Sequence, residues 1–342
     1  MSIIHVLAVE GSPLKVTCKS LWGEDGRIGV GGAELSLLTM CEEWTKRGHE
    51  VVLFNNPKEL HASPFEQRAV GNFSPYDKRD ILIIFRSPTD KVNEATGRKF
   101  WWSHDQQTSG NFAEFSKCVD QVVCVSQFHV DYFKMRYGIN NAVIIENPVR
   151  TQDYAGKKLE RIPNRFLFAS VPDRGLKILL DIWPEIKTAF QDASLVITSD
   201  YRLWGSVYPL NEKYREQAMG LQGIKFKGGI KRAQLIEEQL ISDVLAYPCI
   251  YDELMCISVA EAEVSGAFPI TSTVGALGTT NMGLKLEGDP KTKVWQREFL
   301  GMIYDFLKNP NKEWYRDQVM KTARARFNPE TIANRWDEVF NK

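Results

Sequence analysis

Residues 247–278 of the chain read YPCIYDELMCISVAEAEVSGAFPITSTVGALG. The apolar run 243–247 that leads into this stretch predicts a buried strand. A helix is expected over residues 257–264, since Gly266 fits just past a helix end, and a second strand over residues 268–271. This succession of strand, helix and strand is typical of a parallel sheet with helices packed on it.

Two glutamates in the stretch, Glu253 and Glu261, are separated by seven residues. Glu253 is expected on the loop at the carboxyl end of the first strand, and Glu261 in about the first turn of the helix, with Ser258 as its cap. Ligands of open α/β sheets bind at this edge, where a helix start offers free amides to a phosphate. A carboxylate there accepts hydrogen bonds from vicinal hydroxyls. The residues indicate a nucleotide-sugar pocket, and the alternative is a pair of ordinary solvated glutamates.

Length and composition exclude several classes of protein. The 342 residues are enough for two α/β domains, and the 43 acidic and 43 basic side chains cancel, which gives no electrostatic case for nucleic acid. The N-terminus lacks a basic leader and no apolar run reaches membrane length, so we expect neither a signal peptide nor a transmembrane helix. The six cysteines show no C-x-x-C pair and the five histidines no H-x-x-x-H spacing. Reduced thiols, a cytoplasmic location and the absence of a histidine metal site are expected.

Strand and helix patterns alternate along both halves of the chain. Strands are expected at residues 3–9, 51–54, 81–85, 99–103, 121–125, 142–145, 166–170, 194–198 and 224–226. Residues 29–34 are expected to lead into a helix that ends near 47–48, and a helix is expected to follow the strand 121–125 and to run through 138. Further helices are expected over residues 176–189, 232–241, 294–307, 312–326 and 331–340. Residues 10–30 and 199–223 read as long polar connections, and Trp295 and Trp314 are expected to point inward.

A glycine pair, Gly31 and Gly32, stands at the start of the first long helix. Such a pair lets the backbone approach a diphosphate closely, and a tight turn is the alternative. The dinucleotide fingerprint G-x-G-x-x-G is not present, because Glu34 occupies the third glycine position. This argues against a nucleotide-dependent oxidoreductase.

Two further side chains stand at strand ends or helix starts. His104 follows Trp102-Ser103 at the end of a strand, where a lone histidine is more often structural. Arg174 precedes the helix over residues 176–189, and its planar fork suits a phosphate. An ordinary solvated loop arginine is an equally good interpretation from the residues.

The ordered run Tyr247-Pro248, Glu253, Glu261-Ala262, Ser265-Gly266 and Gly275-Ala276-Leu277 resembles the donor-binding segment of retaining glycosyltransferases of family four, the glycosyl transferases group 1. Gly31-Gly32-Ala33-Glu34 is similar to the loop of their first domain. The resemblance implies an α/β GT-B fold, in which two Rossmann-like βαβ domains face each other across a cleft. Residues 1–149 then form the acceptor-side domain, with helix 330–342 packing back on it, and residues 150–329 form the nucleotide-sugar donor domain.

The resemblance also implies a reaction: transfer of a sugar from a UDP- or GDP-sugar to a glycan, lipid-linked or protein acceptor, with retention of the anomeric configuration. It implies no cofactor, and a cytoplasmic protein that can be peripheral to a membrane. By this resemblance Glu261 holds the ribose, Glu253 holds the donor sugar, and His104 faces the reacting carbon or the acceptor. His104 and Glu253 are therefore the catalytic candidates. The diphosphate lies against Gly31, Gly32, Arg174, Cys256, Ile257 and Ser258.

Departures from the family pattern keep alternatives open. Ser170 stands where the family usually has an arginine, and Gly278-Thr-Thr-Asn281 where it usually has Pro-Glu. No Asp-x-Asp motif is present, so we expect metal-independent transfer. The alternative function is a non-catalytic or hydrolytic nucleotide-sugar-binding protein, or one like an epimerase or phosphorylase.

Overall fold

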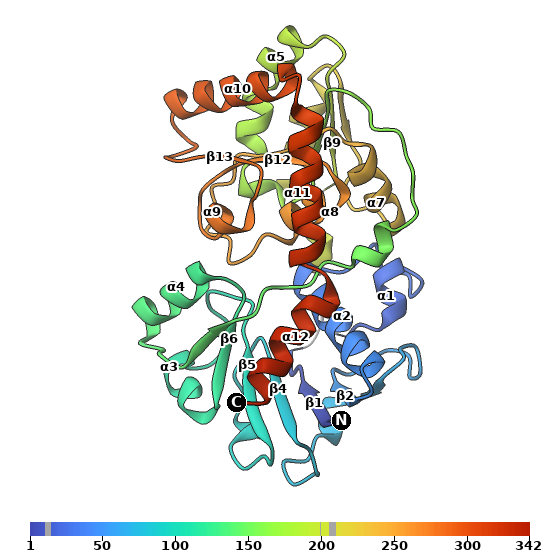
Figure 1. The fold of residues 1–342 in the computed structure, drawn as a ribbon, viewed down its shortest axis with the longest axis vertical. Coiled ribbons are helices and arrows are strands. Elements are labelled where there is room, and N and C mark those ends of the chain that lie inside the picture. The colour runs from blue at the N-terminus through green and yellow to red at the C-terminus, as the bar shows by residue number, and fades with distance from the viewer. Residues whose placement is uncertain (11–14, 199, 205–209) are drawn as a thin grey trace. The chain divides into compact units, whose positions relative to one another are not determined.

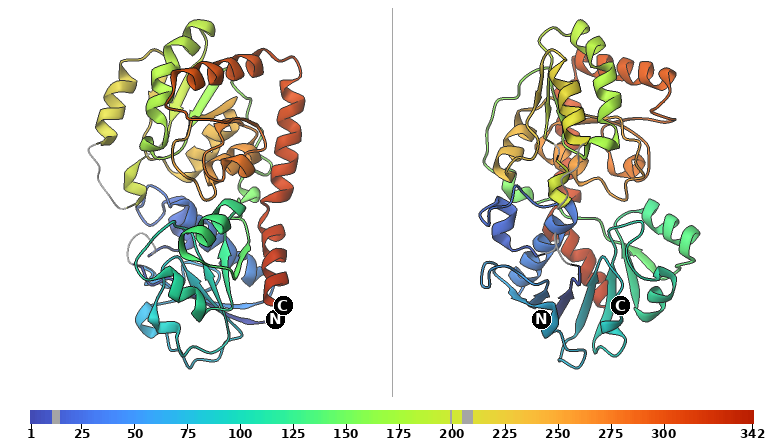
Figure 2. Two further views of the ribbon diagram at one scale, coloured as in Figure 1. Left: turned by 90° about the vertical axis from the view of Figure 1, so that its left-hand side faces the viewer. Right: turned by 180° about the vertical axis from the view of Figure 1, so that it is seen from behind.

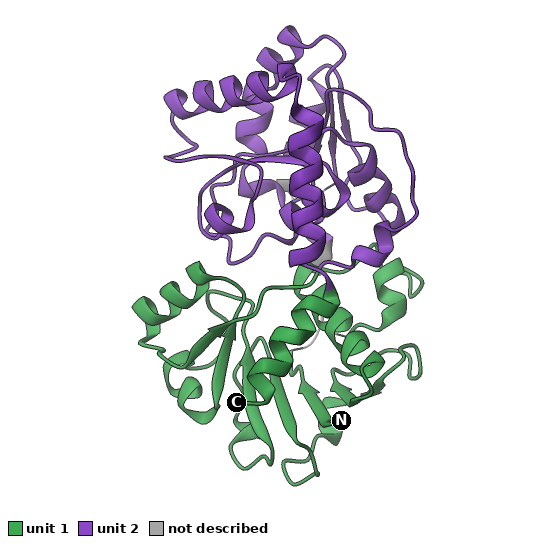
Figure 3. Ribbon diagram, in the orientation of Figure 1, with its two compact units in different colours: residues 1–148, 329–342 green, residues 149–328 purple. Residues whose placement is uncertain are grey.

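Two parallel sheets, one in each half of the chain, organise the computed structural model (Figure 1). It describes residues 1–10, 15–198, 200–204 and 210–342. The chain divides into a first unit of Met1–Pro148 and Pro329–Lys342 and a second unit of Val149–Asn328 (Figure 3). Each of the two boundaries lies one residue before the one expected from the sequence.

The first unit contains a seven-stranded sheet in the order β3-β2-β1-β4-β5-β6-β7, with every pair parallel. Its strands are β1 Ile3–Leu7, β2 Glu50–Phe54, β3 Glu66–Arg68, β4 Ile81–Phe85, β5 Arg98–Trp102, β6 Gln121–Cys124 and β7 Ala142–Ile144. The central strand β4 is buried at every position, as expected for a parallel strand covered on both faces.

The first unit also contains helices from residues 18–137 and the C-terminal helix. They are α1 Cys18–Trp22, α2 Gly32–Lys46, α3 Phe112–Phe115, α4 Gln127–Tyr137 and α12 Pro329–Phe340, with 3₁₀ turns at Val70–Asn72, Asp90–Val92 and Ser116–Cys118. The indole of Trp336 on α12 meets those of Trp44 on α2 and Trp102 on β5 edge-to-face, with ring centroids 5.5 and 5.3 Å apart. This buried aromatic contact fixes the C-terminal helix to the first unit.

The second unit contains a six-stranded parallel sheet in the order β10-β9-β8-β11-β12-β13. Its strands are β8 Arg165–Phe168, β9 Ser194–Ile197, β10 Ile224–Phe226, β11 Val244–Tyr247, β12 Phe268–Ser272 and β13 Leu284–Leu286. Its helices are α5 Leu176–Ala189, α6 Leu210–Met219, α7 Arg232–Ile241, α8 Ile257–Ser265, α9 Leu277–Thr280, α10 Lys293–Lys308 and α11 Lys312–Arg326, with 3₁₀ turns η4 Thr151–Tyr154, η5 Pro172–Arg174 and η6 Tyr201–Trp204. Helix α5 contacts α6 and α10, whereas α8 contacts α7 and α11. Figure 2 shows α5 and α11 on opposite faces of the sheet.

The structure confirms every strand and helix expected from the sequence and adds elements that the patterns did not predict. Helix α1 lies in the expected loop 10–30, α6 lies in the expected polar connection 199–223, and the short strands β3 and β13 were not expected. The prediction for Trp314 was wrong, because its side chain is 60 % exposed. Helix α11 buries the face of Arg316 and Ala323, and Trp314 stands two residues, about 200°, around the helix from Arg316.

Candidate functional site

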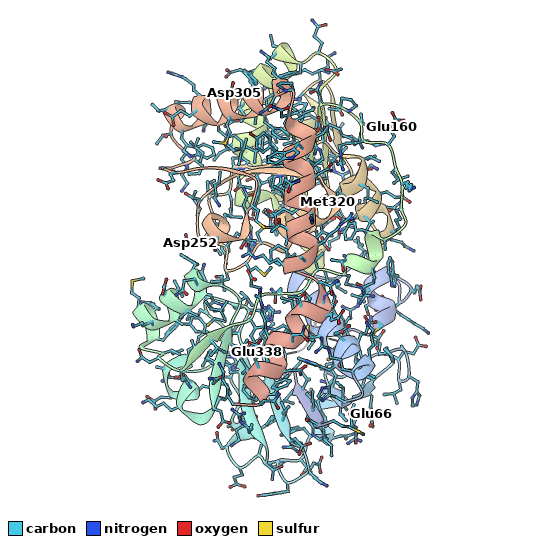
Figure 4. All side chains as sticks on the ribbon, in the orientation of Figure 1. Glu66, Glu160, Asp252, Asp305, Met320 and Glu338 are labelled. Atoms are coloured by element: carbon cyan, nitrogen blue, oxygen red, sulfur yellow. The ribbon has the colours of Figure 1, made fainter. Side chains whose placement is uncertain are left out.

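The stretch 247–278 crosses the carboxyl edge of the second sheet. Strands β8, β11 and β12 are neighbours in that sheet and run parallel, so the loops that follow them meet at one edge. Glu253 lies on the loop after β11, as expected, and α8 begins four residues later, at Ile257. Figure 4 labels the adjacent Asp252, whose side chain is exposed, whereas Glu253 is only 5 % exposed.

Glu253 is held by one side chain from the loop after β8, Arg174, and by one from β11, Tyr247. Its carboxylate oxygens accept hydrogen bonds from Nη1 of Arg174 at 2.9 and 3.1 Å, and Oε1 also accepts one from the Tyr247 hydroxyl at 2.7 Å. The Ser170 hydroxyl lies 2.9 Å from that of Tyr247. Burial raises the pKa of Tyr247 well above its ordinary value, so the phenol is a neutral donor. Arg174 and Glu253, expected to contact different parts of a donor, therefore contact each other.

Two glycines allow the loops to approach Glu253 and Arg174. Gly175 has φ of +133°, and a Cβ atom there would lie 2.2 Å from the carbonyl oxygen of Pro248. Gly275 has φ of +62°, and a Cβ atom there would lie 2.5 Å from the backbone nitrogen of Glu253. The amide of Ala276 donates to the carbonyl of Glu253 at 2.7 Å. The Gly-Ala-Leu loop thus fixes the backbone of Glu253, and only glycine fits at its first position.

The start of α8 differs from the prediction in its cap. The N-cap residue is Cys256, which makes no side-chain capping bond, while Ser258 is the second helical residue. The Ser258 hydroxyl instead donates to the carbonyl of Ala169 at 2.6 Å, which ties the helix start to the loop after β8. The amides of Ile257 and Ser258 belong to the first turn, where a helix offers donors without intrahelical acceptors. Burial raises the pKa of the Cys256 thiol well above its ordinary value, which keeps it neutral and unreactive.

Glu261 lies in the second turn of α8 rather than the first, and it is 4 % exposed. Its Oε1 accepts a hydrogen bond from Nη1 of Arg232 at 2.9 Å, and its Oε2 accepts one from Nε2 of Gln239 at 3.1 Å. The burial of Glu253 and Glu261 excludes the interpretation that they are ordinary solvated residues. Sequence reasoning missed Arg232 and Gln239, although their spacing of seven residues within a predicted helix places them on one face.

The remaining candidates belong to the first unit. Gly31 is the N-cap residue of α2 and Gly32 its first residue. A Cβ atom on Gly31 would lie 2.3 Å from Oε2 of Glu34, so the glycine makes room for this 3 % exposed carboxylate. Burial raises the pKa of Glu34. The close approach at Gly31 is therefore to a side chain within the protein.

Arg86, at the end of β4, is a charged residue that sequence reasoning missed. Its backbone has φ of +64°, which is unusual for a residue other than glycine. Its guanidinium binds Asp105 in bidentate fashion at 2.7 and 3.1 Å and lies 3.3 Å from Glu34 and 3.5 Å from Glu10. These partners follow β5, begin α2 and follow β1, so the cluster occupies the carboxyl edge of the first sheet.

His104 lies beside this cluster. Its ring packs against those of Phe85 and Trp102, with centroids 4.7 and 4.8 Å away. Among the described residues its buried Nε2 has no hydrogen-bond partner. Burial and the charge of Arg86 lower the pKa of His104 well below its ordinary value, so the imidazole is neutral at pH 7.

Comparison with known proteins supports the resemblance that the sequence predicted. Residues 163–281 match the model of the family described as Glycosyl transferases group 1. No curated protein sequence compared with the chain matches it. None of the helices in the described residues is both long and apolar enough to span a bilayer.

Several solved structures share the fold over almost the whole chain. HepE of Anabaena, in complex with UDP and glucose, aligns with a TM-score of 0.68 and 16% identity over 100% of both chains. Sucrose-phosphate synthase of Thermosynechococcus elongatus aligns with a TM-score of 0.71 and 14% identity over 100% of this chain and 98% of its own. A glycosyltransferase of Rickettsia africae aligns with a TM-score of 0.70 and 14% identity over 99% of this chain and 97% of its own. The fold is therefore the predicted GT-B fold with two parallel-sheet α/β units.

Proposed function

We propose that the chain is a glycosyltransferase that moves a sugar from a nucleotide-diphosphate sugar to an acceptor with retention of the anomeric configuration. The observation that carries this proposal is the cluster of Glu253, Arg174 and Tyr247 beside the start of α8. The cluster lies within residues 163–281, which match the family model. HepE is a structural neighbour solved with UDP-glucose, so UDP is the first nucleotide to test.

The contacts support a division of roles within the donor unit. The amides at Ile257 and Ser258 and the positive end of the α8 dipole suit the diphosphate. Arg174, whose side chain is 20 % exposed, can turn a second nitrogen to the diphosphate while Nη1 stays on Glu253. Glu253 then accepts hydrogen bonds from the sugar hydroxyls, and Glu261 accepts those of the ribose.

In the proposed reaction the bond between the anomeric carbon and the phosphate oxygen breaks while the acceptor oxygen bonds to the same face of that carbon. The acceptor proton passes to the leaving phosphate oxygen, so no protein nucleophile takes part. His104, neutral at pH 7, is proposed to hydrogen-bond the sugar or the acceptor. No divalent metal is required in this scheme.

A hydrolytic or non-catalytic nucleotide-sugar-binding protein is the second candidate. It is favoured by the Arg174–Glu253 ion pair, in which the carboxylate already neutralises the arginine, and by Ser170 in place of a second cation. Hydrolysis of the donor in the absence of any acceptor, at the same rate as in its presence, would support this candidate over a transferase.

The test begins with thermal stabilisation by UDP and GDP, because a ligand that binds only the native state raises the melting temperature. Turnover of UDP-glucose and of other nucleotide sugars is then measured with and without glycan, lipid-linked and protein acceptors. The critical variant is Glu253→Gln, and its matched control is Asp252→Asn at the exposed neighbouring position. We expect Glu253→Gln to lose turnover and nucleotide-sugar affinity but to keep nucleoside diphosphate affinity, while Asp252→Asn behaves like the wild type. Failure of every nucleoside diphosphate and nucleotide sugar to bind would refute the proposal.

A further inference from the structure

The face of α7 that meets α8 holds both oxygens of Glu261. Arg232, the first residue of α7, binds Oε1 at 2.9 Å, and Gln239, two turns later, binds Oε2 at 3.1 Å. A carboxylate held at both oxygens cannot rotate about its last side-chain bond without breaking one of the two contacts. The orientation of the Glu261 carboxylate is thus set by α7 and not by α8 alone.

The two partners of Glu261 are themselves held by η4, the first turn of the second unit. Nε of Arg232 donates to Asp153 at 2.8 Å, Asp153 is also bound by Arg150 at 3.2 Å, and the Tyr154 hydroxyl donates to Oε1 of Gln239 at 2.7 Å. Every member of this network, Arg150, Asp153, Tyr154, Arg232, Gln239 and Glu261, is at most 8 % exposed. Its two guanidinium groups and two carboxylates balance in charge, as buried ionic groups require.

A carboxylate has about four lone-pair sites, and the contacts from α7 occupy only two of those on Glu261. The remaining sites can accept hydrogen bonds from two vicinal hydroxyls only if the plane of the carboxylate keeps its orientation toward the bound ribose. We propose that Arg232 and Gln239 are positioning residues that hold Glu261 so that the nucleotide site selects a ribose with both hydroxyls. This inference rests on the proposed function, in which Glu261 contacts the ribose.

The experiment is calorimetric titration with UDP, 2′-deoxy-UDP and 3′-deoxy-UDP, or the guanine series if the wild type prefers GDP. Loss of one hydrogen bond to a charged acceptor is expected to weaken binding about tenfold or more. The wild type should therefore prefer UDP over either deoxy analogue by at least about that factor. In Arg232→Lys, which keeps the positive charge but not the fork, the preference should fall to within about threefold of unity. Gln239→Leu, which removes the other contact, should give the same loss of preference.

Arg165→Lys is the matched control. Arg165 on β8 binds Glu238 at 2.5 Å, and Glu238 lies on α7, the helix that carries Arg232 and Gln239. Among the described hydrogen bonds Arg165 makes no contact with Glu261. It should lower the melting temperature while leaving the preference for UDP unchanged. If Arg232→Lys does not fold, Gln239→Leu and the wild-type preference still test the inference.

Three outcomes would overturn the inference while leaving glycosyl transfer standing. They are a full preference for UDP in the folded variants, equal loss of preference in the Arg165→Lys control, and equal binding of UDP and its deoxy analogues by the wild type. Absence of binding to every nucleoside diphosphate would overturn both the inference and the proposed function.

Discussion

Replacement of Arg174 by methionine removes the cation that balances Glu253 while keeping most of the side-chain volume. The Glu253 side chain is 7 % exposed, and without Arg174 it still accepts a hydrogen bond from the Tyr247 hydroxyl at 2.7 Å. Leaving one member of a buried ion pair without its partner costs about 3–5 kcal/mol. Because the Arg174 side chain is 20 % exposed, we expect the lower end of that range, about 3 kcal/mol.

The reverse change, Glu253→Gln, should be milder, because Arg174 still reaches solvent and lies 4.1 Å from the centroid of the Tyr251 ring. A cost of about 1 kcal/mol is expected for it, in line with the net loss of one hydrogen bond, because the amide nitrogen of glutamine cannot accept from Arg174. The double variant carries no uncompensated charge at this position, so it should cost about 2 kcal/mol instead of the additive sum of about 4 kcal/mol. The expected coupling free energy is therefore about 2 kcal/mol.

Calorimetry of the four proteins measures these differences, and about 3 kcal/mol corresponds to a fall of roughly 6–12 °C in the melting temperature of a unit of this size. Since two units need not unfold together, hydrogen exchange of peptides covering β11 and α8 assigns the change to the second unit. If the double variant costs as much as the two single variants together, the argument is refuted, because the ion pair would then contribute no mutual stabilisation.

Four further predictions concern backbone, protonation, catalysis and metal. Gly275→Ala should lower the free energy of unfolding by about 2 kcal/mol or more, because φ of Gly275 is +62° and the new Cβ would strike the backbone of Glu253. Gly220→Ala meets no such close contact and should be near neutral, and urea unfolding measures both variants. His129 is fully buried, and burial lowers its pKa from 6.5 to about 3. Between these two values the unfolded chain binds a proton that the folded chain does not, so the free energy of unfolding should fall as the pH drops below 6.5, by about 2 kcal/mol at pH 5. In His129→Gln this dependence on pH should be flatter. His104→Ala should reduce turnover far more than donor affinity, and the pH profile of wild-type turnover should show no inflection near 6.5 from this imidazole. Turnover should persist in excess chelator, and complete loss restored by magnesium or manganese would contradict metal independence.

Local patterns in the sequence predicted most of the fold. Three helices, α5 Leu176–Ala189, α7 Arg232–Ile241 and α11 Lys312–Arg326, have the expected bounds, because long amphipathic or well-delimited segments carry a clear signal. The elements that were missed, such as α1 and the three-residue strands β3 and β13, are short or polar. Such segments owe their structure to neighbouring elements and not to a period of their own.

The sequence alone placed Glu253 after a strand and Glu261 on a helix, because the position of a residue relative to a strand end or a helix start is local information. The side-chain partners of the two glutamates are not local, because Arg174 stands 79 residues before Glu253 and Arg232 stands 29 residues before Glu261. Only the tertiary structure decided that Arg174 pairs with Glu253 and that α7 fixes Glu261. Loops that follow β8, β11 and β12 meet because those strands are neighbours in the sheet, and strand order is a property of the packed sheet as a whole.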